Sequence, residues 1–207
     1  MITNKVYVNN KGVGRTDALK ETEHMCDYLK LPRKSRLHIR LLTEEMLGMV
    51  SEIAGDFDAE FWVEHESKFC RLCLEAEITK MSSEKRNSLI EVSTSGKNAA
   101  AKGIMGKLKE IVELYWLGYK DGVEDSTGID FSTYTGMAMS TMSSVAGSTQ
   151  WTLCDYRSKI ERQKDSGKGE EWDELDELEK SIVANIADDI SIGIKGETVM
   201  IVITKEM

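Results

Sequence analysis

The chain has little of several residue types on which function is often built. Its 207 residues include one proline, three histidines and four cysteines. No apolar run approaches the roughly 20 residues that a membrane-spanning helix needs. Asp and Glu (36) outnumber Lys and Arg (27), which gives a net charge of -9. A dedicated nucleic-acid or anionic-membrane binder needs a basic face, so we expect neither nucleic acid nor membrane as a partner.

The first ten residues, MITNKVYVNN, also lack the apolar core of a signal peptide. We therefore expect a cytoplasmic protein, in which a reducing environment leaves the cysteines as free thiols. Hydrophobic residues make up 41% and charged residues 30% of the sequence, which is typical of soluble globular proteins. The length fits one domain that carries an insertion.

Metal and nucleophile chemistry has few candidates. His24, His38 and His65 are scattered, and they predict no Ser/His/Asp or Cys/His grouping. Cys70 and Cys73 form a single CxxC, but no second pair exists to complete a structural zinc site. Their segment is predicted to be a strand, on which residues three apart point to opposite faces. We therefore expect no metal site there.

Hydrophobic periodicity predicts an order of strand, helix, helix, strand, strand, helices, strand, strand. The predicted strands are KVYVNN, AEFWVEHE, SKFCRLCLEAEI and the closing hairpin ISIGI-KGE-TVMIVITK. A first helix is predicted from Asp17 to Leu29. A second starts at Pro32, because proline fits the first turn of a helix. Later helices are predicted in SSEKRNSLIEV, KLKEIVELYWLGY and WDELDELEKSIVANIADD.

Residues 118–170 are interpreted as a helical or loop insertion. Most of this segment is rich in Ser, Thr, Gly and Met, which is compatible with disorder. Apolar residues at helical steps instead favour a helix from about Met137 to Lys164. The insertion is too short to form its own core, so residues 1–207 are predicted as a single domain. The fold class is α+β, a two-layer sandwich with helices on one face of one mixed or antiparallel sheet.

The stretch Ser93–Ile111, STSGKNAAAKGIMGKLKEI, is the first candidate binding segment. Small residues let backbone N–H groups approach a phosphate, a helix N-terminus follows, and Lys97 and Lys102 add positive charge. The stretch is not a Walker A loop, because Asn98 follows the Gly-Lys pair where Ser or Thr is needed. A phosphate-binding loop and a loop that only leads into a helix are both compatible with these residues.

The second candidate lies in the long helix, within RLLTEEMLGMV. A carboxylate at the rim of an apolar face can act as a general base that orients water. The alternative is an ordinary solvated helix charge. A helix turns about 100° per residue, so Glu44 and Glu45 cannot both face one pocket.

The order of elements, with these motifs, resembles the histidine-kinase-type ATPase superfamily, and within it the bacterial anti-sigma-factor serine kinases. The resemblance covers residues 1–115 and 180–207. In that family the long helix carries a Glu and, one turn later, an Asn that holds magnesium. Glu44 matches the Glu, and the resemblance implies that it is the catalytic base. Gly48 occupies the Asn position, which removes the metal ligand and argues against bound Mg²⁺.

The family's other nucleotide contacts match this chain in part. An Asp-x-Gly-x-Gly motif, whose Asp reads adenine, follows the family's hairpin, whereas CLEAEITKM offers only Glu75 and Glu77 and no glycine. The family's lid ends in a glycine-rich phosphate loop, and a Thr of its closing hairpin lies beside adenine. The implied nucleotide-binding residues are Gly48, Glu77, Ser95, Gly96, Lys97, Asn98, Gly103, Gly106 and Thr198.

The resemblance therefore implies a divergent ATP-binding regulatory protein of the anti-sigma-factor kinase type, with ATP or a related nucleotide under the lid. The changed magnesium and adenine positions predict very slow turnover or none, because phosphoryl transfer relies on metal to neutralise developing charge. The alternative is a non-enzymatic protein-interaction module that keeps the fold but has lost nucleotide chemistry. In either case the expected partner is another protein or a second copy of the chain.

Overall fold

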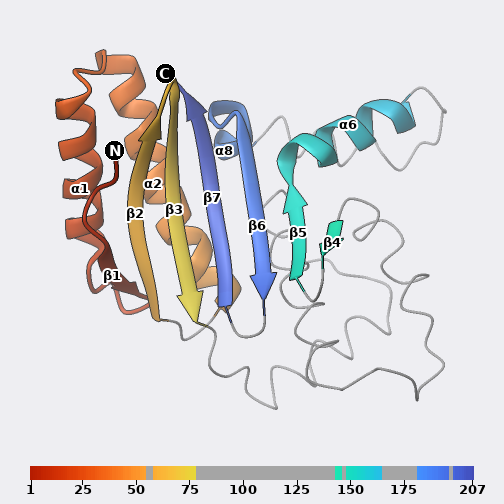
Figure 1. The fold of residues 1–207 in the computed structure, drawn as a ribbon, viewed down its shortest axis with the longest axis horizontal. Helices are drawn as coiled ribbons and strands as arrows, with labels where there is room; N and C mark the ends of the chain where they lie inside the picture. Colours follow the sequence, from red (N-terminus) through yellow and green to blue (C-terminus); the bar gives the residue numbers. More distant parts are fainter. Residues whose placement is uncertain (55–57, 78–142, 146–147, 165–180, 196–197) are drawn as a thin grey trace.

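The computed structural model describes residues 1–54, 58–77, 143–145, 148–164, 181–195 and 198–207. Within these residues seven strands form one sheet in the order β1-β2-β3-β7-β6-β5-β4 (Figure 1). Every neighbouring pair is antiparallel. The strands are β1 (Val6–Asn9), β2 (Asp58–Glu66), β3 (Phe69–Glu77), β4 (Ser143–Val145), β5 (Ser148–Thr152), β6 (Asp189–Lys195) and β7 (Thr198–Glu206).

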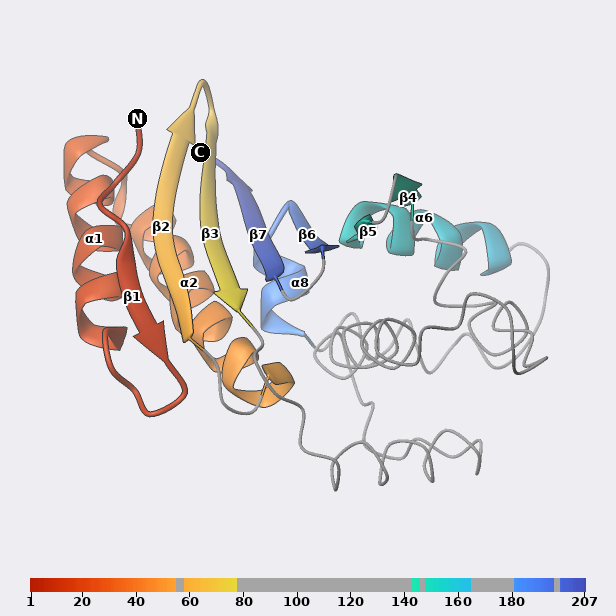
Figure 2. The ribbon, with the colours of Figure 1, turned by 60° about the horizontal axis from the view of Figure 1, so that its bottom comes forward.

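Two long helices, α1 (Arg15–Tyr28) and α2 (Arg33–Ala54), lie side by side on one face of this sheet (Figure 2). The predicted α+β arrangement, with helices packed on one face of a sheet, is confirmed at this coarse level. The predicted start of the second helix after Pro32 is also confirmed. Between the two helices, the Thr22 and Thr43 hydroxyls are fully buried and lie 3.1 Å apart, and each is 2.9 Å from a backbone carbonyl oxygen of its own helix. These buried polar groups therefore have hydrogen-bond partners.

The strand register gives the sheet one apolar face. Val63, Leu72, Ile203 and Ile190 align across β2, β3, β7 and β6, and all four are fully buried. The next row toward the other end of the strands is Phe61, Leu74, Ile201 and Ile192. Because side chains alternate along a strand, the residues between these rows point to the opposite face. The core therefore lies between the sheet and the two helices.

Gly14 joins β1 to α1 in a conformation that requires glycine. Its φ is +74°, and a Cβ at this position would lie 1.8 Å from the carbonyl oxygen of Tyr7. Only a residue without a side chain lets α1 start this close to β1.

The structure corrects the predicted helix from about Met137 to Lys164. Among the described residues of this range, Leu153–Lys164 is helical (α6), whereas residues 143–145 and 148–152 form β4 and β5. Trp151 pairs with Ile192 of β6 and is almost fully buried, so its burial in the sheet outweighed the helical spacing of apolar residues. Part of the predicted insertion therefore belongs to the main sheet.

Of the remaining predicted elements, some are confirmed and the others lie outside the described residues. Both predicted hairpins are confirmed, β2–β3 and the closing β6–β7. A short helix, α8 (Ile182–Ile186), lies at the end of the predicted acidic helix. The helices predicted in SSEKRNSLIEV and KLKEIVELYWLGY, and the acidic helix up to residue 180, lie outside the described residues. In the described part of the chain no helix is both long and apolar enough to cross a membrane.

Candidate functional site

Glu44 lies on α2 at its seam with α1. Its Oε1 accepts a hydrogen bond of 3.1 Å from Arg40 Nε, and Arg40 also forms an ion pair with Glu23 of α1. The Glu44 side chain is 34% exposed, and Glu45 is exposed. The Glu44 carboxylate is therefore held by Arg40, which bridges α1 and α2, and it is partly exposed to water.

Gly48 lies one helical turn beyond Glu44. A Cβ built at this glycine would meet no atom within 4 Å, so the position has room for a side chain. The glycine is therefore not required by packing. In the part of the chain that the structure describes, no group of three or more His, Cys, Asp or Glu residues could hold a metal ion.

The sheet brings Glu77 and Thr198 together. They are paired in register where β3 ends and β7 begins. The next pair along the two strands, Ala76 and Val199, is buried in the core between the sheet and the helices. Since side chains alternate, Glu77 and Thr198 lie on the sheet face opposite α2.

The candidate residues therefore form two groups rather than one. Glu44 and Gly48 lie on α2, and Glu77 and Thr198 pair on the other face of the sheet. The predicted loop residues Ser95, Gly96, Lys97, Asn98, Gly103 and Gly106 lie outside the described residues. Glu77 is the last described residue before the segment that contains them.

The thiols of β3 are buried and protonated. All four cysteines are free, as expected, and only Cys154 is exposed. Burial raises the pKa of Cys70 and of Cys73 to about 12, so neither is a thiolate at neutral pH. Cys70 pairs with His65 and Cys73 with Trp62, at positions of opposite parity on β2, so the two thiols lie on opposite faces of the sheet.

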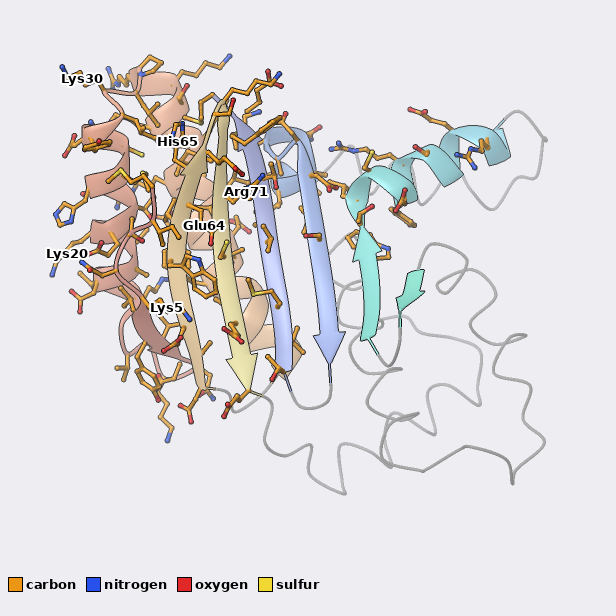
Figure 3. All side chains as sticks on the ribbon, viewed as in Figure 1. Lys5, Lys20, Lys30, Glu64, His65 and Arg71 are labelled. Carbon is orange, nitrogen blue, oxygen red and sulfur yellow. The ribbon has the colours of Figure 1, made fainter. Side chains whose placement is uncertain are left out.

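A charged cluster on the face opposite the helices escaped the sequence analysis. Lys5 Nζ lies 4.5 Å from the centre of the Trp62 ring and 2.7 Å from a carboxylate oxygen of Glu60. A second carboxylate, from Glu75, is 3.7 Å from the same nitrogen. Figure 3 labels Lys5 beside β2. Only the strand register brings these residues together, and no local motif could have indicated them.

Comparisons with models of known protein families, with curated proteins and with solved structures found no match for this chain.

Proposed function

We propose that this chain is a divergent, cytoplasmic bacterial regulatory protein of the anti-sigma-factor kinase type, which binds ATP or a related nucleotide without appreciable turnover. The observation that carries the proposal is the pairing of Glu77 with Thr198. These residues are far apart in the sequence, and the resemblance assigns both to the adenine end of one nucleotide site. Their pairing supports a common site at the end of β3 and β7.

The element order gives further support. Within residues 1–77 and 181–207 the described strands and helices follow the order on which the resemblance rests, and the closing strand β7 lies beside β3 in the middle of the sheet. The chain between Glu77 and β4 holds the glycine-rich stretch whose backbone N–H groups and lysines would bind phosphates. Glu77 therefore lies at the start of the segment that would cover a nucleotide.

We infer the loss of ATP turnover from two residues of α2, Gly48 and Glu44. Gly48 offers no oxygen ligand to Mg²⁺, and the Glu44 carboxylate is engaged by Arg40. Phosphoryl transfer depends on a metal ion to neutralise charge and on a base that can reach the attacking hydroxyl. A protein of this kind would use nucleotide as a ligand that stabilises one conformation.

A second candidate function is a protein-interaction module without nucleotide. The placement of Glu44 and Gly48 on one side of the sheet, and of Glu77 and Thr198 on the other, favours it. Ala76 and Val199, which take the positions on the α2 side, offer no side-chain hydrogen bond to a base.

A thermal-shift measurement with ATP and with ADP, each with and without Mg²⁺, tests the proposal. A ligand that binds only the native state stabilises it by about 2.7 kcal/mol at a hundredfold excess over Kd. For a chain of this size that is a rise in Tm of roughly 5–10 °C. We expect a shift that does not need Mg²⁺. No shift with either nucleotide would overturn nucleotide binding and leave the interaction module.

Two glycine variants test whether the glycine-rich stretch belongs to the nucleotide site. Gly103→Val places a branched side chain where the backbone must approach phosphate, so the nucleotide shift should be lost. Gly193→Val is the matched control, because a Cβ at this strand position meets nothing within 4 Å. A shift that survives in both variants would exclude the glycine-rich stretch from the site.

A further inference from the structure

The end of α1, the connection to α2 and the first turns of α2 are strongly basic in an acidic protein. Residues 28–40, YLKLPRKSRLHIR, contain five Lys or Arg residues and no Asp or Glu, whereas the whole chain has a net charge of -9. This segment forms the end of the helical hairpin where α1 finishes and α2 begins (Figure 1).

Two of the five cations are neutralised within the fold. Arg36 forms an ion pair with Asp27, and Arg40 forms ion pairs with Glu23 and Glu44. The other three cations are Lys30, Arg33 and Lys34. All three are exposed, and none forms an ion pair with a described residue. Figure 3 shows Lys30 at the end of the hairpin.

Other cations at this end of the molecule do have acidic partners. The β2–β3 turn and the end of β7 lie at the same end as the α1–α2 connection (Figure 1). There Lys68 pairs with Glu206, and Lys205 pairs with Asp188. Lys30, Arg33 and Lys34 are therefore a local excess of positive charge without an ion-pair partner among the described residues.

Exposed apolar side chains accompany the excess charge. Tyr28 is 68% and Leu37 is 54% exposed. Leu37 follows Arg33 by four and Lys34 by three residues on α2, and such residues are neighbours on one helix face. The N-terminus of α2 adds a positive partial charge at the same place. We call Tyr28, Lys30, Arg33, Lys34 and Leu37 the α1–α2 corner.

We infer that the α1–α2 corner binds an acidic segment of a partner protein that also carries an apolar side chain. Carboxylates of the segment would meet the three unpaired cations, and its apolar residue would cover Leu37 and Tyr28. Interfaces combine an apolar centre with complementary charge in this way. The inference goes beyond the proposed nucleotide function and does not depend on it, because the corner contains none of the proposed nucleotide residues.

The number of cations at the corner distinguishes a short acidic peptide from an extended polyanion such as a duplex or an anionic bilayer. Tight binding to a duplex or to an anionic bilayer recruits many cations, on the order of 6–10 phosphate contacts for a DNA-binding protein. The corner offers three, on a chain whose remaining charge repels an extended polyanion. A short peptide presents its charges only at the corner, and screening over about 10 Å weakens repulsion from the rest of the molecule.

The test uses the full chain without nucleotide and a fluorescein-labelled peptide of Glu-Glu-Leu repeats, followed by fluorescence anisotropy. A peptide with Gln in place of Glu is the control ligand. We expect saturable binding of the Glu peptide that weakens with salt, and about tenfold weaker binding to the Arg33→Glu/Lys34→Glu variant. Acidic residues are favoured in the first turn of a helix, so this variant should keep its fold and its Tm.

The matched control is Lys11→Glu/Arg15→Glu. It reverses two exposed cations that form no ion pair with a described residue. Lys11 lies in the β1–α1 connection and Arg15 begins α1, at the other end of the hairpin. We expect this variant to bind the peptide as wild type does. Leu37→Ser should weaken binding severalfold and leave the salt dependence unchanged, because it removes no charge.

Three results would overturn the inference. The first is no binding of the Glu peptide by wild type, and the second is equal loss of binding in the two double variants. The third is tighter binding of phosphatidylserine vesicles or duplex DNA than of the peptide, lost on Arg33→Glu/Lys34→Glu. That result would assign the corner to a membrane or a nucleic acid instead.

Discussion

Cys70 and Cys73 show how position in the sheet decides the chemistry of a residue. The CxxC spacing alone is compatible with metal binding or redox exchange. The strand places the two thiols on opposite faces, and burial raises the pKa of each to about 12. A protonated thiol is a poor nucleophile and a poor metal ligand. These cysteines therefore act as small apolar residues of the fold.

The raised thiol pKa values predict a loss of stability at high pH. Above the ordinary pKa of 9.0, the unfolded chain releases thiol protons that the folded protein keeps up to about pH 12. The unfolded state is then favoured, so the free energy of unfolding should fall by about 1.4 kcal/mol per pH unit for each thiol. Urea denaturation from pH 8 to 11 measures this slope.

Replacing one thiol distinguishes its contribution to the pH dependence of stability from the contributions of other groups that titrate in the same range. Cys70→Ala should lower stability at neutral pH but give a shallower slope above pH 9. The matched control is Cys154→Ala, which removes the exposed thiol and should leave the slope unchanged. Identical slopes in wild type and Cys70→Ala would contradict the role of burial at Cys70.

Replacing Gly14 and Gly48 by Ala should have opposite effects on the free energy of unfolding. Gly14→Ala forces a Cβ against the Tyr7 carbonyl at a positive φ, so it should lower the free energy of unfolding by more than about 2 kcal/mol. Gly48→Ala adds a methyl group in open space inside α2, so it should raise that free energy by about 0.5–1 kcal/mol. Urea denaturation of both variants checks the pair.

A destabilising Gly48→Ala would contradict the open surroundings of Gly48. A tolerated Gly14→Ala would mean that the β1–α1 connection can move away from Tyr7. The contrast also bears on function, because the surroundings of Gly48 leave room for a side chain at that position.

The segment 143–164 shows where periodicity fails for a whole element. Apolar residues recur there at helical steps, yet β5 pairs with β6 and α6 begins only at Leu153. The start of α6 has a local signal in the sequence. Thr152 Oγ1 accepts a hydrogen bond of 3.1 Å from the backbone N–H of Asp155, which is the pattern of a helix N-cap. A strand-forming Trp directly before such a cap indicates a strand that ends there.

Across the whole molecule, local patterns predicted β2, β3, β7 and α2 but not which strands lie beside one another. The alternation in β2, β3 and β7 and the single proline before α2 fix these elements from the sequence, because each depends on nearby residues. The pairing of β5 with β6 and the cluster of Lys5, Trp62 and Glu60 depend on contacts between distant segments. The pairing of Glu77 with Thr198 is likewise visible only once β7 lies beside β3.

We propose that this fold binds nucleotide without a magnesium site. Titration calorimetry of ATP into the full chain, in Mg²⁺ and again in EDTA, tests it most directly, with Gly48→Asn as the companion variant. We predict saturable binding to wild type with the same Kd in both buffers. Gly48→Asn, which has room for the new side chain, should bind more tightly in Mg²⁺ only. No saturable heat from wild type, or wild-type binding that disappears in EDTA, would contradict the account.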